Sequence, residues 1–448
     1  MKSLYRSSKK SKPQNSARLE AAQRLDVLEE RDGYIGLGNQ SGSSSAVNER
    51  HTRDLVSGVT RRRRYLDFLI QSYYKGKADS MEQRLKTVLR MGMYELLFTS
   101  TPDHAALNEA VELARDYVRE GAASLANGIL RTVLRNKDNL PVPAETPLET
   151  YLGIMYSHPD WMVKRWLGTV LKDATLKMLE RNNERPVFGV HIVSGRDRVL
   201  EALEKANVAV TASELVPDFI RISSIQPLFR GGFFKDGSVR VQDEAAALVV
   251  HAMCPAREDS ILDMCAAPGG KALYAALLMA ETGKVVAADI HSKRLHLLDK
   301  NMELFDVSNL DMEEMDGTRP PDKWGEAFDK VLVDAPCTGL GVLSKRADMR
   351  WHREESDLKD LIQLQIRLLD GAAACVKPGG LLVYSTCTTE REENMGQVEA
   401  FLERHADFRL EPAPDIIPAR LRDAQGNYES RPYESDMDGA FAARLRKK

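Results

Sequence analysis

The apolar residues between positions 17 and 135 recur at helical spacing, and no strand-like alternation interrupts them. A polar stretch rich in serine and glycine, at 38–48, breaks the pattern and predicts a loop. Helices are predicted over 17–30 and near 53–75, 78–99, 105–119 and 122–135. The first part of the chain is therefore predicted to be a small all-α domain, at 17–140.

The pattern changes after residue 140. Three prolines, at 141, 143 and 147, predict a linker, and a further helix is expected after Trp161. Short alternating runs follow, such as 187–193 and 219–223, with glycines as turns between them. This pattern is typical of a small α+β module, so we predict a linker helix and such a module over 141–258.

From residue 260 onward, apolar strand patterns alternate with helical ones, as a parallel α/β sheet requires. A third domain, of α/β type, is therefore predicted over 259–448. Its strands are predicted at 260–265, 284–289, 328–334 and 381–386, and its helices at 270–282, 292–305, 356–377 and 390–405.

Composition narrows the class of protein. A chain of 448 residues is expected to form two or three domains, and its net charge of −3 neither favours nor excludes an RNA partner. The five cysteines are odd in number and lack Cys-x-x-Cys spacing, so neither a disulfide framework nor a metal site is predicted. A reducing, cytoplasmic location follows. No apolar run is long enough to predict a membrane span.

Two basic features leave alternatives open. Residues 1–16 are basic and lack an apolar stretch, which favours a disordered tail over an organelle transit peptide and excludes a secretory signal. Residues 61–64 are four consecutive arginines within a predicted helix. At about 100° per residue they cannot share one face, so a solvated helix side and a phosphate contact both remain open.

A glycine-containing loop at 263–271 reads DMCAAPGGK and joins a predicted strand to a predicted helix. Glycines at such a turn let a ligand approach the backbone, and the helix N-terminus offers free N–H groups to an anion such as a carboxylate. Asp289 ends the next strand, where an acid can accept hydrogen bonds from ribose hydroxyls. The loop lacks the dinucleotide and P-loop spacings, so it predicts another nucleotide-like cofactor.

Two cysteines follow the ends of predicted strands: Cys337 in DAPC and Cys387 in YSTCT. Ligands of open α/β sheets bind at that edge. A thiolate that adds to C6 of a pyrimidine makes C5 nucleophilic enough to accept a methyl group, after which the C5 proton and the thiol are eliminated. Asp334 is expected beside the ring. Cys254, Cys265 and Cys375 are predicted to be ordinary buried residues.

These motifs, with Glu393 and Asn394 downstream, resemble those of the RNA cytosine-C5 methyltransferases. The layout over 17–448 is similar to the branch that acts on small-subunit ribosomal RNA, and the helical region resembles the NusB fold through HAALNEAV (104–111) and NGILR (127–131). The resemblance implies a Rossmann-like methyltransferase domain, S-adenosylmethionine as donor, RNA as partner, and a monomer.

Residue roles follow from the same resemblance. Cys387 is implied as the nucleophile, Cys337 as the group that assists product release, and Asp334 as a further catalytic residue. The cofactor site is implied to comprise Cys265, Ala266, Ala267, Pro268, Gly269, Gly270, Lys271, Asp289, Asp316 and Asp334. Lys345, Arg346, Asp348 and Trp351, in the loop after Cys337, are candidates for RNA contact.

The chain departs from the family pattern at two places. Gly189-Val190-His191 stands where relatives carry Arg-x-Asn, and Ala440 replaces an aromatic residue. The expected function is transfer of a methyl group to C5 of a cytosine, in small-subunit ribosomal RNA. A transfer-RNA enzyme and a non-enzymatic RNA-binding factor are the alternatives.

Overall fold

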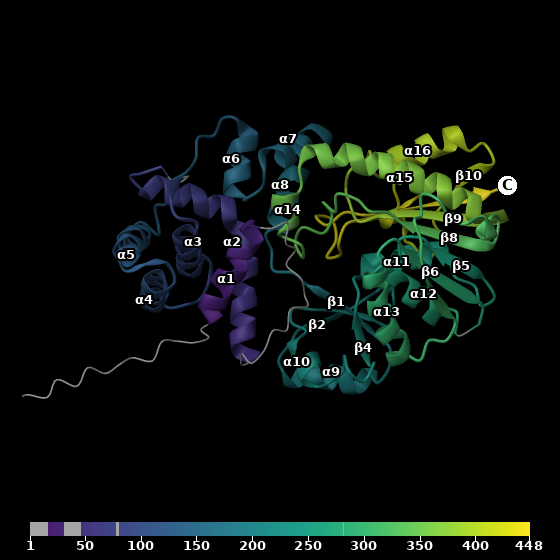
Figure 1. Ribbon diagram of the computed structural model, residues 1–448, viewed down its shortest axis with the longest axis horizontal. Coiled ribbons are helices and arrows are strands. Elements are labelled where there is room, and N and C mark those ends of the chain that lie inside the picture. The colour runs from purple at the N-terminus through teal and green to yellow at the C-terminus, as the bar shows by residue number, and fades with distance from the viewer. Residues whose placement is uncertain (1–16, 31–45, 78–79, 281) are drawn as a thin grey trace, which may run out of the picture. The chain divides into compact units, whose positions relative to one another are not determined.

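The computed structural model describes residues 17–30, 46–77, 80–280 and 282–448 (Figure 1). The chain divides into two compact units. The helical unit comprises the residues up to Thr175 together with Arg346–His352, and the catalytic unit comprises Leu176–Lys345 and Arg353–Lys448. The predicted basic tail and most of the predicted serine- and glycine-rich loop lie outside the described residues.

The helical unit is all-α in its described part, as predicted. Its core consists of aliphatic side chains from facing helices, among them Leu66, Leu69, Val88 and Leu130, each fully buried. A short π-helical turn, Ala114–Val118, links α4 to α5. The helices are α1 (Ala17–Glu30), α2 (Ala46–Tyr73), α3 (Gln83–Phe98), α4 (Asp103–Leu113), α5 (Glu120–Arg135), α6 (Leu148–Met155) and α7 (Asp160–Thr169).

The four arginines at 61–64 lie on α2 and contact groups of their own unit. Arg61 is buried. The other three have these partners: the ring of Phe98 for Arg62 at 4.9 Å, the carboxylate of Glu29 for Arg63 at 2.9 Å, and the carboxylate of Asp160 for Arg64 at 2.6 Å. Neither alternative left open by the sequence, a solvated helix side or an open phosphate contact, describes these side chains.

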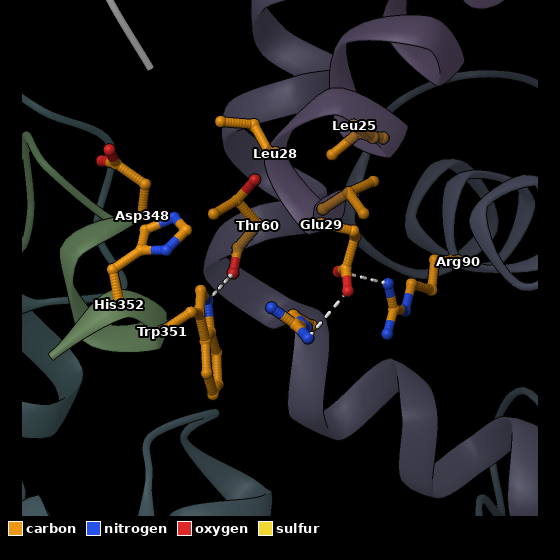
Figure 2. Close-up of a pocket in the computed structure, with 10 residues that line it drawn as sticks. Leu25, Leu28, Glu29, Thr60, Arg90, Asp348, Trp351 and His352 are labelled. Carbon is orange, nitrogen blue, oxygen red and sulfur yellow. Dashed lines mark hydrogen bonds and ion pairs between the residues drawn. The ribbon is translucent and has the colours of Figure 1, made fainter. Parts of the chain in front are cut away.

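Residues 346–352, which include α14 (Met349–His352), belong to the helical unit although they follow the Cys337 loop in sequence. The indole N–H of Trp351 donates to the carbonyl of Thr60 at 2.7 Å, and Figure 2 shows Trp351 beside α2 in a pocket also lined by Leu25, Leu28 and Asp348. Asp348 is buried. Both residues thus have contacts within the helical unit, and an RNA contact of Asp348 or Trp351 stays a prediction.

The catalytic unit begins with a small α+β module. Its antiparallel sheet has the order β2-β3-β1-β4. The predicted runs at 187–193 and 219–223 are strands β1 and β3, whereas β2 and β4 were not predicted, because each has only three residues. The elements are α8 (Lys172–Arg181, which starts in the helical unit), β1 (Phe188–Ile192), α9 (Arg196–Lys205), β2 (Val210–Ala212), β3 (Phe219–Ile222), α10 (Gln226–Arg230) and β4 (Val239–Val241).

The departure at Gly189 has a physical reason in this module. A Cβ atom on Gly189 would lie 2.4 Å from the carbonyl oxygen of Gln242, so no side chain fits there without a shift of the backbone. The neighbouring His191 is buried and stacks on Phe219, with ring centroids 4.7 Å apart.

The large sheet of the catalytic unit has the order β10-β12-β9-β8-β5-β6-β7, and β11 pairs with β12. Strands β5 to β9 are parallel and β12 is antiparallel to β9, so the sheet is mixed. The strands are β5 (Ser260–Asp263), β6 (Lys284–Asp289), β7 (Leu310–Glu314), β8 (Phe328–Asp334), β9 (Val376–Thr386), β10 (Phe408–Glu411), β11 (Tyr428–Ser430) and β12 (Ala440–Lys447). The helices are α11 (Glu244–Met253), α12 (Gly270–Leu278), α13 (Ser292–Leu304), α15 (Glu355–Cys375) and α16 (Met395–Arg404).

Both faces of this sheet are buried. Alternate residues of each parallel strand enter two separate apolar clusters: Ile261 and Val285 lie in one, and Leu262 and Val286 in the other. A parallel strand that is buried on both faces consists mostly of apolar residues. Its polar side chains therefore lie at its ends. Across the described residues, no helix is long and apolar enough to cross a membrane.

Candidate active site

Three carboxylates end three neighbouring strands of the large sheet: Asp334 on β8, Asp263 on β5 and Asp289 on β6. These strands are parallel, so their carboxyl ends meet at one edge, which is where open α/β sheets bind ligands. The loop after β5 and the two predicted cysteines lie at the same edge. The predicted site residues are thus brought together.

The loop from Cys265 to Gly269 is held in shape by the acid of the next strand. Asp289 accepts a hydrogen bond from the backbone N–H of Ala267 at 3.0 Å with Oδ2, and from that of His291 at 2.9 Å with Oδ1. Arg294 donates to the carbonyl of Ala267 at 2.9 Å. Gly269 has φ +97°, a conformation that favours glycine. Asp289 therefore orders the loop through both of its carboxylate oxygens.

Asp263 is a buried acid that is 1% exposed. Burial, with repulsion from Asp334, raises the pKa of Asp263 to about 7, whereas Lys271 and the backbone N–H of Cys265 act in the opposite direction. No side chain of the described residues donates to its carboxylate oxygens.

Two further residues complete the pocket edge. Asp316, after β7, is exposed and accepts hydrogen bonds from the N–H and hydroxyl of Thr318, which lower the pKa of Asp316. Ile290, directly after Asp289, is an exposed apolar side chain at the same edge. These groups fit the parts of S-adenosylmethionine. Acids can bind its hydroxyl and cationic groups, and an apolar side chain can pack against its base. The N–H groups at the start of α12 can bind its carboxylate.

The two predicted cysteines face each other. Cys337 follows β8 and Cys387 follows β9, which are paired strands, and their Sγ atoms are 3.4 Å apart. Cys337 is buried, whereas Cys387 is partly exposed. The two residues of the pair therefore differ in burial, and Cys337 is the more buried.

The surroundings make the two thiols unequal. The hydrogen bond from Cys337 lowers the pKa of Cys387, and the ammonium group of Lys271 contributes in the same direction, against burial and Asp334. That same bond, burial and the carboxylate of Glu393 raise the pKa of Cys337. Cys387 is thus the thiol that ionises more readily. Either sulfur can donate while both are protonated, and Cys337 is the donor once Cys387 is a thiolate.

Lys271 has a contact that the sequence did not reveal. It was predicted only as part of the cofactor loop, but its Nζ lies 2.6 Å from Oδ2 of Asp334. Ser385 donates to the other oxygen of Asp334 at 2.8 Å. Burial would lower the pKa of Lys271, but Asp334 outweighs it and the pKa is raised. The charged pair stands beside Cys387.

The buried carboxylate of Glu393 links the loop after β9, which carries Cys387, to the loop after β8, which carries Cys337. Glu393, after β9, accepts hydrogen bonds from the N–H of Thr338 at 2.9 Å and from the amide of Gln365 at 3.0 Å. Burial raises the pKa of Glu393. Arg353 also donates to the carbonyl of Cys337 at 3.2 Å. Glu393 and Arg353 thus position the loop that carries Cys337.

The other cysteines lie apart from this pair. Cys375, in α15, is buried as predicted, and Cys265 is only partly buried. The prediction that Cys254 is buried was wrong: it is exposed, because it ends α11 in a left-handed conformation with φ 51°. Lys345, an RNA-contact candidate, instead pairs with Asp438 at 2.9 Å and with Asp243.

Together, the mixed sheet with its parallel centre, the glycine loop and the strand-end acids define an S-adenosylmethionine-dependent methyltransferase. The family model described as 16S rRNA methyltransferase RsmB/F matches residues 250–446, and that of the NusB family matches residues 15–135. With the relatives below, these matches show that the chain belongs to the RsmB/F family of RNA methyltransferases and carries a NusB-type helical domain.

Full-length relatives support the assignment. The chain is 30% identical over 445 residues to the probable ribosomal RNA small subunit methyltransferase B of Bacillus subtilis, covering 96% of this chain and 98% of the relative. It is 34% identical over 401 residues to the ribosomal RNA small subunit methyltransferase B of Shigella sonnei, covering 88% and 90%. The crystal structure of PH0851 is similar with a TM-score of 0.80 at 25% identity, covering 96% and 98%.

Proposed function

We propose that this enzyme methylates C5 of a cytosine in small-subunit (16S) ribosomal RNA through a covalent bond between Cys387 and C6 of the base. The observation that carries the proposal is the pair of thiols, 3.4 Å apart at the ends of β8 and β9. Methylation of an exocyclic nitrogen or a ribose hydroxyl needs no nucleophilic thiol, whereas C5 of a pyrimidine does. The names of the relatives support the choice of ribosomal RNA.

Each residue has a defined part in this scheme. The Cys387 thiolate forms a bond to C6, and the electron pair of the C5–C6 double bond makes C5 nucleophilic. S-adenosylmethionine, when bound, supplies the methyl group that C5 takes up. Loss of the C5 proton then restores the double bond, and the Sγ–C6 bond breaks to return the Cys387 thiolate.

Cys337 is the proposed proton acceptor at C5. While Cys387 is ionised, the Cys337 thiol donates to it. Once the sulfur of Cys387 is bonded to carbon, it no longer holds the proton on Cys337. The Cys337 thiol is then proposed to pass its proton to the carboxylate of Glu393, whose pKa is raised by burial, and the resulting thiolate takes the proton from C5.

Asp334 and Lys271 are proposed to bind the polar edge of the cytosine. The carboxylate of Asp334 is held by Lys271 and Ser385, so its position is fixed before substrate arrives. A carboxylate can accept from the exocyclic amino group, and an ammonium group can donate to a ring acceptor. The remaining predicted cofactor residues, Cys265 to Gly270, Asp289 and Asp316, are proposed to hold the cofactor.

Mapping the methylated position tests this function. The purified protein is incubated with methyl-labelled S-adenosylmethionine and, separately, with 16S ribosomal RNA and transfer RNA. We expect label in 16S RNA at a cytosine that resists bisulfite conversion, and none with Cys387→Ala. Label in transfer RNA alone would point to the transfer-RNA alternative. Label on a ribose or an exocyclic nitrogen would contradict the proposal. A cytoplasmic monomer remains the expectation.

A further inference from the structure

Arg240 lies on β4 and contacts the cofactor loop directly. It is 7% exposed, and its Nη2 donates to the carbonyl of Gly270 at 2.6 Å and to the side chain of Gln242. Gly270 is both part of the glycine loop and the first residue of α12. The guanidinium group is thus anchored where the loop becomes a helix.

No carboxylate of the described residues compensates this charge. The guanidinium carbon lies 5.7 Å from the ring centroid of Tyr274, and Nη1 is buried without a hydrogen-bond partner in the described chain. Burial lowers the pKa of Arg240 to about 10, and the neighbouring Tyr274 acts in the opposite direction. Arg444, which is partly buried, differs: it pairs with Glu411 at 3.0 Å.

A buried and unpaired guanidinium is expensive, because its desolvation is not repaid. The start of α12 adds positive potential at the same place, since its first N–H groups point away from the helix. Acidic side chains stand at the ends of three strands of the large sheet: Asp263, Asp289 and Asp334. Arg240 is thus a basic group at the start of α12, where the glycine loop ends, and acids lie at the strand ends.

We propose that Arg240 binds the α-carboxylate of the methionine part of S-adenosylmethionine. This ligand carries a carboxylate together with cationic groups, which suit Arg240 and the acids respectively. An RNA phosphate would suit the charge too, but the deep burial of Arg240 favours a small ligand that occupies the cofactor pocket. The inference does not depend on which base or atom of the RNA is methylated.

Binding of two cofactor analogues tests it without any methyl transfer. Calorimetry compares S-adenosylmethionine with decarboxylated S-adenosylmethionine, which lacks only the carboxylate. The wild-type protein should bind the carboxylate-bearing form roughly ten-fold or more tightly, as for a hydrogen bond between charged groups. In Arg240→Met this preference should fall to about one-fold, whereas Arg240→Lys should retain part of it.

Arg444→Met is the control, because it removes a partly buried guanidinium from β12 and should leave the preference intact. Equal affinity of the wild-type protein for both analogues would overturn the proposal without any variant. So would an Arg240→Met protein that weakens both analogues equally, since Arg240 would then only tie β4 to α12. An unchanged preference in Arg240→Met with weaker RNA binding would assign the site to phosphate instead.

Discussion

The loop after β8 (residues 335–345) and the loop after β9 (residues 387–394) present the same functional group at equivalent places, and they differ in what surrounds it. Cys337 is buried near the carboxylate of Glu393, and its pKa is raised. Cys387 is partly exposed near Lys271, and its pKa is lowered. A strand-end position therefore brings a thiol to the site, but neighbouring charges and burial decide whether it attacks or receives a proton.

The largest expected effect follows from removing the thiol of Cys387. Cys387→Ala should reduce methyl transfer on the order of 10⁴-fold or more, as loss of a covalent nucleophile does elsewhere. Cofactor affinity should stay near the wild-type value, because the cofactor loop is anchored by Asp289. Labelled-methyl transfer and calorimetry measure the two quantities. Cys375→Ala, at a buried cysteine in α15, is the control and should keep its activity; an active Cys387→Ala would remove the distinction between the loops.

A smaller effect separates thiol activation from substrate binding. Asp334→Asn removes a negative charge that raises the pKa of Cys387, so Cys387 should ionise at lower pH in this variant. Methyl transfer should nevertheless fall roughly 10²-fold, because the charged pair with Lys271 is lost. Iodoacetamide labelling and activity assays should thus move in opposite directions.

Asp329→Asn is the matched control for that variant. Asp329 lies on the same strand, and its carboxylate pairs with Lys377 at 2.9 Å. This pair lies outside the site, so its loss should leave both labelling and activity near wild type. Slower labelling in Asp334→Asn, together with slower methylation, would mean that Asp334 helps to ionise the thiol.

The smallest effect is a difference in pH dependence. Thiolate is the reactive form, so the alkylation rate rises with pH through the pKa of each thiol. With its lowered pKa, Cys387 should reach half-maximal labelling at lower pH than an unfolded control peptide, and Cys337, with its raised pKa, at higher pH. Mass spectrometry of the two peptides measures both profiles. Coinciding profiles would show that the surroundings do not distinguish the thiols.

The sequence predicted the parts of the fold that burial dictates. Strands 284–289 and 328–334 have the predicted bounds, because each contains a short buried apolar run, VVAA and VLV. The meeting of Cys337 and Cys387 was predicted from the geometry of parallel strand ends. The short strands β2 and β4 were not predicted, since three residues carry too little pattern, and β2 is exposed throughout.

Contacts between residues distant in sequence could not be predicted. Lys271 and Asp334 are 63 residues apart, and their pairing depends on how α12 follows β5. The arginines at 61–64 are conspicuous in the sequence, but each contacts groups of its own unit. Arg240 is inconspicuous, yet it is the buried arginine beside the cofactor loop that lacks a carboxylate partner among the described residues. Whether a charged side chain can bind a ligand depends on which groups it already contacts, and those contacts are known only from the fold.

The central claim is that Cys387 attacks the base and Cys337 releases it, and trapping of the protein–RNA adduct tests this most directly. Each variant is incubated with 16S RNA and S-adenosylmethionine and run on a denaturing gel. Cys337→Ala should give a slow band, because attack and methylation proceed but elimination stalls, whereas Cys387→Ala should give none. A slow band with Cys387→Ala and none with Cys337→Ala would show that the two roles are reversed.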